Sequence, residues 1–210
     1  MLTKEEVLSF RMPRWEELPD IGLYMDQVLG VVERNLALFS KIDDSKTLTP
    51  TMVNNYVKQK ILEPPQNKKY NRQQLARLTI ICIFKKFLNL GEIADGCRML
   101  LEHYPNDRLY NIVCEEIETA LHNAFTEPEI VVPRADDAER SDILIVRRGA
   151  MAFANIMYAR AEIGAYHEMR EAAAREREEA AQKEKRLRHL HRIIRTCFDF
   201  DGTLPYAPVL

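Results

Sequence analysis

The hydrophobic positions along this chain recur mostly with the 3.6-residue period of amphipathic helices, and the alternating runs typical of strands are scarce. A first helix is predicted at about 20–39, where an apolar stripe recurs with helical spacing. A second begins at Pro50, because Thr49 is a favoured N-cap and proline suits the first helical position. Pro64 and Pro65 stop this helix, since proline cannot continue one.

Three further helices are predicted after the proline turn. Asn71 with Gln74 three residues later forms a capping-box pattern, and the helix that it begins is apolar almost all round. We therefore expect this helix to be the central buried element. Asn89 with Glu92 repeats the capping pattern for a fourth helix, and a fifth is expected at about 106–125.

The last part of the chain reads as one long helix after a clear boundary. Residues 127–140 contain Pro128 and Pro133 and are expected to form a linker, and the helix is predicted from Ser141 to about Cys197. It carries a heptad seam of Tyr166, Ala173, Ala180, Leu187 and Ile194, with Met169, Glu176, Lys183 and Leu190 at the companion positions. This pattern is consistent with a coiled coil between two copies, with an exposed helix, or with a helix folded back on its own domain.

Composition agrees with a folded, mainly helical protein, because 46% of the residues are hydrophobic, 30% are charged and only seven are glycine. No apolar run reaches the roughly 20 residues of a membrane span, and we see no export signal, so we expect a cytoplasmic location. The histidines are isolated or too poorly spaced to chelate, so we expect no metal and no cofactor. The four cysteines form no C-x-x-C pair and are expected to be reduced, mostly core residues: Cys82, Cys97, Cys114 and Cys197.

The basic residues are unevenly distributed along the chain. Nine of them, against Glu63 alone, lie between Lys46 and Lys86, which gives this segment a net charge of +8 in a chain whose total is -2. A run of charge is usually a solvated surface, but this one coincides with the predicted helix, turn and helix. The coincidence favours a polyanionic partner such as nucleic acid.

The stretch LTPTMVNNYVK, followed by KKY and an apolar helix within residues 48–100, carries a family resemblance. It resembles the DNA-binding half of MerR-type regulators, with a short recognition helix ending in a Tyr, a K-I-L turn and a brief wing. It resembles even more closely an uncharacterised bacterial family, known only as a domain of unknown function, that carries the same signature. Two positions differ from MerR-type regulators, since Asn54 stands where Arg is common and Lys60 where Gly is common. The resemblance implies an all-α fold with a winged helix-turn-helix head.

The predicted recognition helix and wing carry side chains suited to DNA contact. Amide and hydroxyl groups bond base edges, as Asn does with adenine in the major groove, and basic groups neutralise phosphates. Tyr56 and Tyr70 are expected to pack in the core and at the root of the wing. The candidate DNA-binding residues are Thr51, Asn54, Asn55, Lys58, Gln59, Lys68, Lys69 and Arg72.

These patterns lead to the hypothesis of a sequence-specific, double-stranded-DNA-binding transcriptional regulator that acts as a homodimer. The predicted organisation is a DNA-binding head at 1–126 with its core at 48–104, a linker at 127–140, a dimerisation region at 141–198 and a tail at 199–210. The alternative is a helical adaptor that binds proteins without sequence-specific DNA binding. No small-molecule effector can be named from the sequence.

Residues 199–204 read DFDGTL, which resembles the nucleophile motif of haloacid-dehalogenase-type phosphatases. In those enzymes the first Asp attacks phosphate, and here it would be Asp199, with Asp201 as acid or base. The chemistry needs further strands that carry Lys and acidic groups, and only six residues follow Leu204. We therefore expect the motif to be coincidental and the protein not to be an enzyme.

Overall fold

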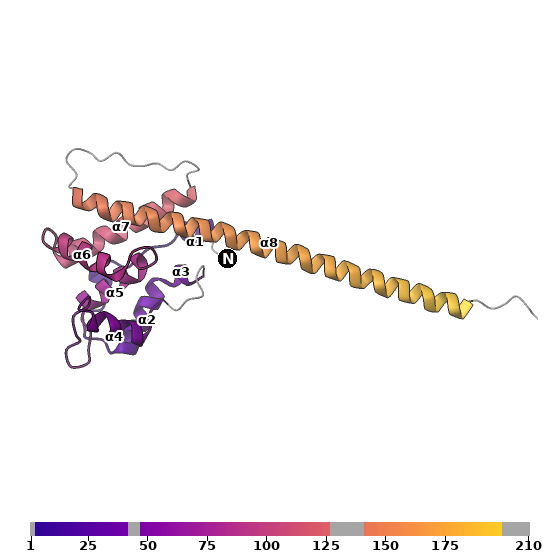
Figure 1. Ribbon diagram of the computed structural model, residues 1–210, viewed down its shortest axis with the longest axis horizontal. Coiled ribbons are helices and arrows are strands. Elements are labelled where there is room, and N and C mark those ends of the chain that lie inside the picture. The colour runs from indigo at the N-terminus through magenta and orange to yellow at the C-terminus, as the bar shows by residue number, and fades with distance from the viewer. Residues whose placement is uncertain (1–2, 42–46, 127–140, 199–210) are drawn as a thin grey trace, which may run out of the picture. The chain divides into compact units, whose positions relative to one another are not determined.

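The computed structural model describes residues 3–41, 47–126 and 141–198, and every regular element in these ranges is a helix (Figure 1). The all-α class is thus confirmed. The chain forms two compact units, Met1–Gly164 and Ala165–Leu210, and the second begins inside the last helix. The elements are α1 (Lys4–Leu8), the 3-10 turn η1 (Trp15–Glu17), α2 (Met25–Asn35), α3 (Ala37–Ser40), α4 (Pro50–Lys58), α5 (Arg72–Phe84), α6 (Leu90–Leu101), α7 (Asn106–Thr126) and α8 (Ser141–Phe198).

Three of the predicted helix starts are confirmed by their caps. The side-chain oxygens of Thr49, Asn71 and Asn89 accept hydrogen bonds from the backbone N–H three residues later, at 3.2, 2.9 and 3.0 Å respectively. In α5 and α6 the glutamine or glutamate at that third position returns a bond to the cap backbone, which completes a capping box. Each cap satisfies N–H groups that the first helical turn leaves without a partner.

The predicted helix at 20–39 begins later and is divided. It starts at Met25, and Leu36, with φ of -114° and ψ of 16°, separates α2 from α3. The later start has a tertiary cause, because Leu23 is extended and exchanges two backbone hydrogen bonds with Tyr70, at 2.9 and 2.8 Å. This pairing joins the segment before α2 to the segment before α5.

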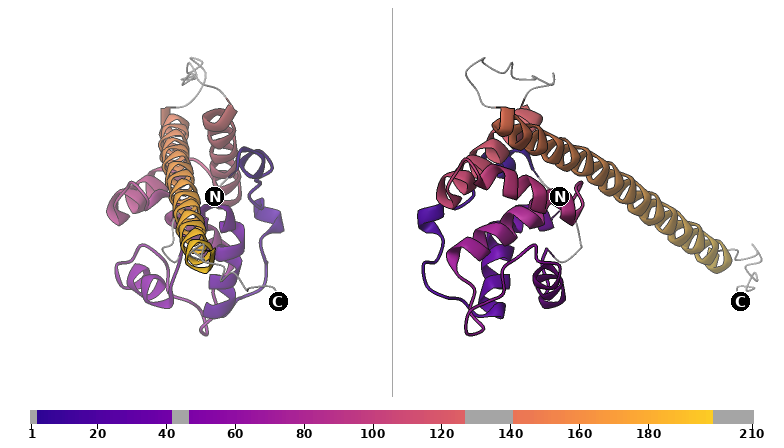
Figure 2. Two further views of the ribbon diagram at one scale, coloured as in Figure 1. Left: turned by 90° about the vertical axis from the view of Figure 1, so that its right-hand side faces the viewer. Right: turned by 60° about the vertical axis from the view of Figure 1, so that its left-hand side comes forward.

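Helix α5 is the buried centre of the first unit, as its all-round apolar sequence predicts. Ten of its 13 residues are buried, and it contacts α2, α6 and α7. Figure 1 shows α5 between α7 on one side and α2 and α4 on the other, and Figure 2 shows the same helices from two further directions. Helices α2, α6 and α7 can therefore bury their apolar stripes against it.

The beginning of α8 belongs to the core of the first unit. Phe153 is 1% exposed, and its ring meets that of Phe39 edge-on with centroids 4.9 Å apart. One turn earlier, a Cβ on Gly149 would lie 2.6 Å from Cε1 of Phe84, so only glycine allows this approach of α8 to α5. The sequence places the domain boundary at 127–140, which lies outside the described residues, whereas the compact unit extends to Gly164.

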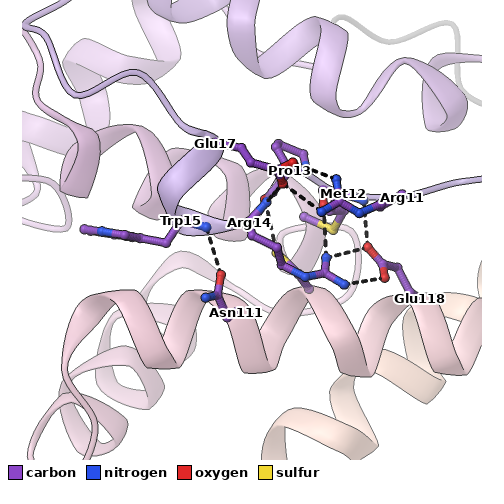
Figure 3. Close-up of polar contacts among 9 residues, drawn as sticks. Arg11, Met12, Pro13, Arg14, Trp15, Glu17, Asn111 and Glu118 are labelled. Atoms are coloured by element: carbon purple, nitrogen blue, oxygen red, sulfur yellow. Dashed lines mark hydrogen bonds and ion pairs between the residues drawn. The ribbon is translucent and has the colours of Figure 1, made fainter.

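The segment between α1 and α2, which we call the N-terminal arm, is held along α7 by hydrogen bonds that involve side chains, which Figure 3 shows. The guanidinium of Arg14 donates two bonds to the carboxylate of Glu118, at 2.7 and 2.8 Å, and Met12 N donates to the same carboxylate at 2.7 Å. The hydrogen bond to Glu118 raises the pKa of Arg14 above its usual value. Trp15 in the same arm is partly buried, and its backbone N–H donates to Oδ1 of Asn111 at 2.8 Å.

Cys82, Cys97 and Cys114 are buried and unpaired, in agreement with reduced core residues. Burial raises the pKa of the Cys82 thiol to about 11 and that of Cys114 to about 12, so these thiols stay protonated at neutral pH. The side chain of Cys197 lies outside the described part of the chain. Among the helices that the structure describes, none combines the length and apolar character needed to cross a bilayer.

The second unit is described as far as residue 198, and there it consists of the C-terminal part of α8. Its side chains are exposed from Tyr166 to His191. The large apolar members of the predicted seam share this exposure, namely Tyr166, Met169, Leu187 and Leu190. The seam therefore has no covering within the described residues.

Candidate nucleic-acid interface

Helix α4 presents one polar face to solvent and one apolar face to the core. Val53 and Tyr56 are buried at 0% and 4% exposure, which confirms the expected core position of Tyr56. The polar residues stand three and four positions apart, so they share the opposite face of the helix. This face consists of Thr51, Asn54, Asn55 and Lys58, all exposed.

The C-terminus of α4 closes with a tight turn that requires an unusual backbone conformation. Ile61 N donates to Tyr56 O at 2.9 Å and Lys60 N to Val57 O at 3.0 Å, which is the bonding pattern of a Schellman motif. Lys60 occupies the left-handed position of this motif with φ of 59°. Glycine usually stands there because it has no Cβ to clash with the backbone.

A second tight turn follows at Gln66 to Lys69, at the site of the predicted wing. The two residues exchange backbone hydrogen bonds of 3.0 and 2.8 Å, and Asn67 and Lys68 between them have φ of 48° and 64°. Two successive positive φ values define a type I′ turn, for which Asn-Gly is the favoured pair. Asn67 fits this preference, whereas Lys68 stands where glycine is favoured. Lys68 is exposed, and the turn is continued by the pairing of Tyr70 with Leu23.

Several candidate side chains already have partners. Gln59 Nε2 donates a hydrogen bond to Oδ1 of Asn55 at 3.2 Å within the candidate set, whereas Lys69 and Arg72 contact residues outside it. The ammonium of Lys69, on an exposed side chain, lies 5.1 Å from the centroid of the Tyr24 ring, and Gly22 leaves room for its stem. The side chain of Arg72 is only 25% exposed and lies 3.9 Å from the carboxylate of Asp20. Arg72 also lies 6.0 Å from the centroid of the Trp15 ring, so it mainly joins α5 to the N-terminal arm.

A family model described as "Domain of unknown function (DUF1836)" matches residues 13–124, which is more than half of the chain. The chain belongs to the DUF1836 family. The sequence-based expectation of an uncharacterised family is thus confirmed. No curated protein and no solved structure matches the chain.

The DUF1836 region begins just before η1 and ends within α7, so it contains all eight candidate residues and excludes α1 and α8. Seven of the eight side chains are exposed, and they come from α4 and the two turns that follow it. Arg72 is the exception. The site therefore occupies one continuous stretch of the chain, from Thr51 to Lys69.

Gln74 positions the connection between α4 and α5 within the DUF1836 region, in addition to its predicted capping role. Its side chain is buried, at 5% exposure, and its Nε2 donates to the carbonyl oxygens of Glu63 at 2.8 Å and Pro64 at 3.2 Å. These bonds hold the chain where the two prolines leave few donors for pairing. The sequence pattern reveals the cap but not this second role, because the partners lie ten and eleven residues away.

Some basic residues of the segment from Lys46 to Lys86 are exposed, and others bond to the rest of the protein. Lys58, Lys60 and Lys68 are exposed. Lys85 instead donates from Nζ to the carbonyl oxygen of Thr47 at 2.7 Å, which ties the end of α5 to the segment before α4. Lys46 lies outside the described residues. The exposed charge is therefore concentrated around α4 and its two turns.

Proposed function

We propose that this protein is a sequence-specific DNA-binding protein and transcriptional regulator, with α4 as the recognition helix of a MerR-like winged helix-turn-helix. The main support is that two lysines, Lys60 and Lys68, occupy positive-φ positions in the two turns that follow α4, with φ of 59° and 64°. A non-glycine residue in this region costs roughly 1 kcal/mol, and such strain is typical of functional sites. The two side chains therefore serve a purpose that glycine could not fulfil, and phosphate contact matches their charge and exposure.

The outward face of α4 supplies the groups that direct base recognition needs. Asn54 and Asn55 are exposed and adjacent, and an asparagine can accept from N6 and donate to N7 of adenine in the major groove. Lys58 follows one turn later on the same face, where it would reach a phosphate. The turn at 66–69 would contact the DNA backbone beside the major groove, as the wings of winged helix-turn-helix proteins do.

Recognition by so short a helix requires two copies, because one α4 reads too few base pairs to be selective. We place the dimer contact on the second unit, where Tyr166, Met169, Leu187 and Leu190 are exposed with heptad spacing. Large apolar side chains in such an arrangement favour association with another helix.

The charged companions Glu176 and Lys183 favour an antiparallel orientation of the two helices. In a parallel pair each would face its own counterpart, which places like charges opposite each other in the seam. In an antiparallel pair Leu187 faces Met169 of the second copy and Leu190 faces Tyr166 of the second copy. Glu176 then lies about one turn from Lys183 of the second copy, so the charges attract.

Binding to duplex DNA over a range of salt concentrations tests the proposal. We expect an affinity that falls steeply with salt, and Lys58→Ala should weaken binding to all duplexes while reducing the slope of log affinity against log salt by about 1. Asn54→Ala and Asn55→Ala should each cost about 1–3 kcal/mol at the preferred site and much less on random DNA. The preferred site is first obtained by selection from a random oligonucleotide pool.

The variant Lys68→Gly tests whether Lys68 occupies its positive-φ position for the sake of DNA contact. It should raise the free energy of unfolding by up to about 1 kcal/mol, because glycine adopts a positive φ freely. It should also weaken DNA binding and reduce the salt slope, because one phosphate contact is lost. A duplex affinity that is absent, or that does not depend on salt, would reject DNA binding and favour the adaptor alternative.

A dimer through the second unit predicts a clear effect of charge in the seam. The double variant Leu187→Asp, Leu190→Asp should raise the dimer dissociation constant at least about 100-fold, because apolar surface that the dimer buries becomes charged. Gln182→Asp, at an exposed position off the seam, should leave the dimer dissociation constant nearly unchanged. Sedimentation equilibrium measures both constants, and a monomeric parent chain or equal effects of the two variants would contradict this contact.

A further inference from the structure

A pocket of about 340 Å³ lies where the end of α4 meets α5 and α6, and of its lining residues only Lys60 also belongs to the proposed DNA contact. Its volume is within the range of small-molecule sites, roughly 300–1,000 Å³. Ile61 and Leu101 give it an apolar part. Its charged lining consists of Lys60 from the turn after α4, Arg77 from α5, Arg98 from α6, and Glu102.

The charge of the pocket is predominantly positive, since three cations from three different elements face one acidic group. Arg98 is also paired with Asp95, at 3.1 Å, but both side chains are more than 70% exposed, so this pair is weak. Arg77 is half-buried, and among the described residues it makes no hydrogen bond or ion pair. A partly desolvated guanidinium without a partner is well suited to bind a carboxylate or phosphate with two parallel hydrogen bonds.

We propose that this pocket binds a small organic anion that carries at least two negative charges and one hydrogen-bond donor. Arg77 and Arg98 bind its carboxylate or phosphate groups, Lys60 adds a third cation, and Glu102 accepts a hydrogen bond from a hydroxyl or amino group. The apolar side of Ile61 and Leu101 contacts the carbon skeleton. A DNA backbone fits this site less well, because its phosphodiesters offer no donor to Glu102 and it has no means of filling a concave apolar surface.

The pocket lies next to the C-terminal end of α4, so a bound ligand can affect that helix. Lys60 and Ile61 form the turn that ends α4, and Ile61 N bonds to the carbonyl oxygen of Tyr56 at 2.9 Å. An anion held by Lys60 together with α5 and α6 therefore restrains the end of α4. If the protein binds DNA as proposed above, the ligand alters its DNA affinity, and this consequence alone depends on the proposed function.

Titration of the full-length protein with anions in the absence of DNA tests the site. Citrate, which has three carboxylates and one hydroxyl, and inorganic phosphate are the probes, followed by calorimetry and amide NMR at low chloride. We expect saturable binding of one citrate per chain with a dissociation constant on the order of 1 mM or tighter, and weaker binding of phosphate. The amide signals of Lys60, Ile61, Arg77 and Arg98 should move together.

Variants then distinguish the pocket from general attraction to a basic surface. Arg77→Gln and Arg98→Gln should each weaken citrate binding about tenfold or more, because each removes charge-assisted hydrogen bonds. Lys69→Gln, which removes an exposed charge outside the pocket, should leave it unchanged. The proposal is overturned by a lack of saturable binding of both probes or by equal effects of all three variants.

Discussion

Replacing Phe153 with alanine is expected to lower the free energy of unfolding of the first unit by about 3–5 kcal/mol, the cost of removing a fully buried phenyl ring. Phe153 is 1% exposed and meets Phe39 edge-on, so the cavity would open between α8 and α3. Aromatic contact adds to the loss of buried area. Denaturant unfolding followed by the fluorescence of Trp15, the only tryptophan, measures the change.

The matched control is Ile163→Ala, which removes a 58% exposed side chain from the same helix. It should change stability by less than about 0.5 kcal/mol. Similar small values for both variants would mean that the beginning of α8 does not form part of the core, contrary to the structure. A large value for Phe153 alone would support a compact unit that reaches Gly164 rather than one that ends before residue 127.

Replacing Arg14 with alanine is expected to cost about 2–3 kcal/mol, between the values for exposed and buried ion pairs. The two side chains of the pair with Glu118 are 22% and 21% exposed, and the contact is bidentate at 2.7 and 2.8 Å. Without Arg14, the bond from Met12 N is the one hydrogen bond that the half-buried carboxylate keeps among the described residues. Thermal and denaturant unfolding at neutral pH provide the measurement.

Arg11 offers a direct comparison, because it pairs with Glu17 at 2.9 Å while the two side chains remain 56% and 46% exposed. Arg11→Ala should cost no more than about 1 kcal/mol. A double-mutant cycle of Arg14→Ala with Glu118→Gln isolates the coupling between these two residues. If Arg11→Ala and Arg14→Ala are equally mild, the arm is not held on α7 through Glu118.

The sequence predicted most reliably those features that depend on neighbouring residues. The caps at Thr49, Asn71 and Asn89 each involve partners three residues apart, and the burial of α5 follows from a continuous apolar run. The late start of α2 could not be predicted, because it depends on a pairing between Leu23 and Tyr70, which are far apart in the chain. The hold of Glu118 on the N-terminal arm was missed for the same reason.

The candidate interface was predicted less evenly. The exposed face of α4 follows from helical spacing, so the positions of Asn54 and Lys58 could be foreseen. The partial burial of Arg72 could not, because its neighbours Asp20 and Trp15 come from the arm. The backbone conformations of Lys60 and Lys68 were also hidden, although a lysine at the usual position of glycine was a visible signal at Lys60.

The backbone pairing of Leu23 with Tyr70 limits how far this binding element can be transplanted. The two hydrogen bonds, at 2.9 and 2.8 Å, fasten the end of the turn-bearing loop to a strand-like residue 47 positions earlier in the chain. A chimera that received only residues 48–71 would lack these two hydrogen bonds, and the backbone groups of Tyr70 would need other partners. Protein engineers who wish to move the element to a new scaffold should therefore carry the segment before α2 with it.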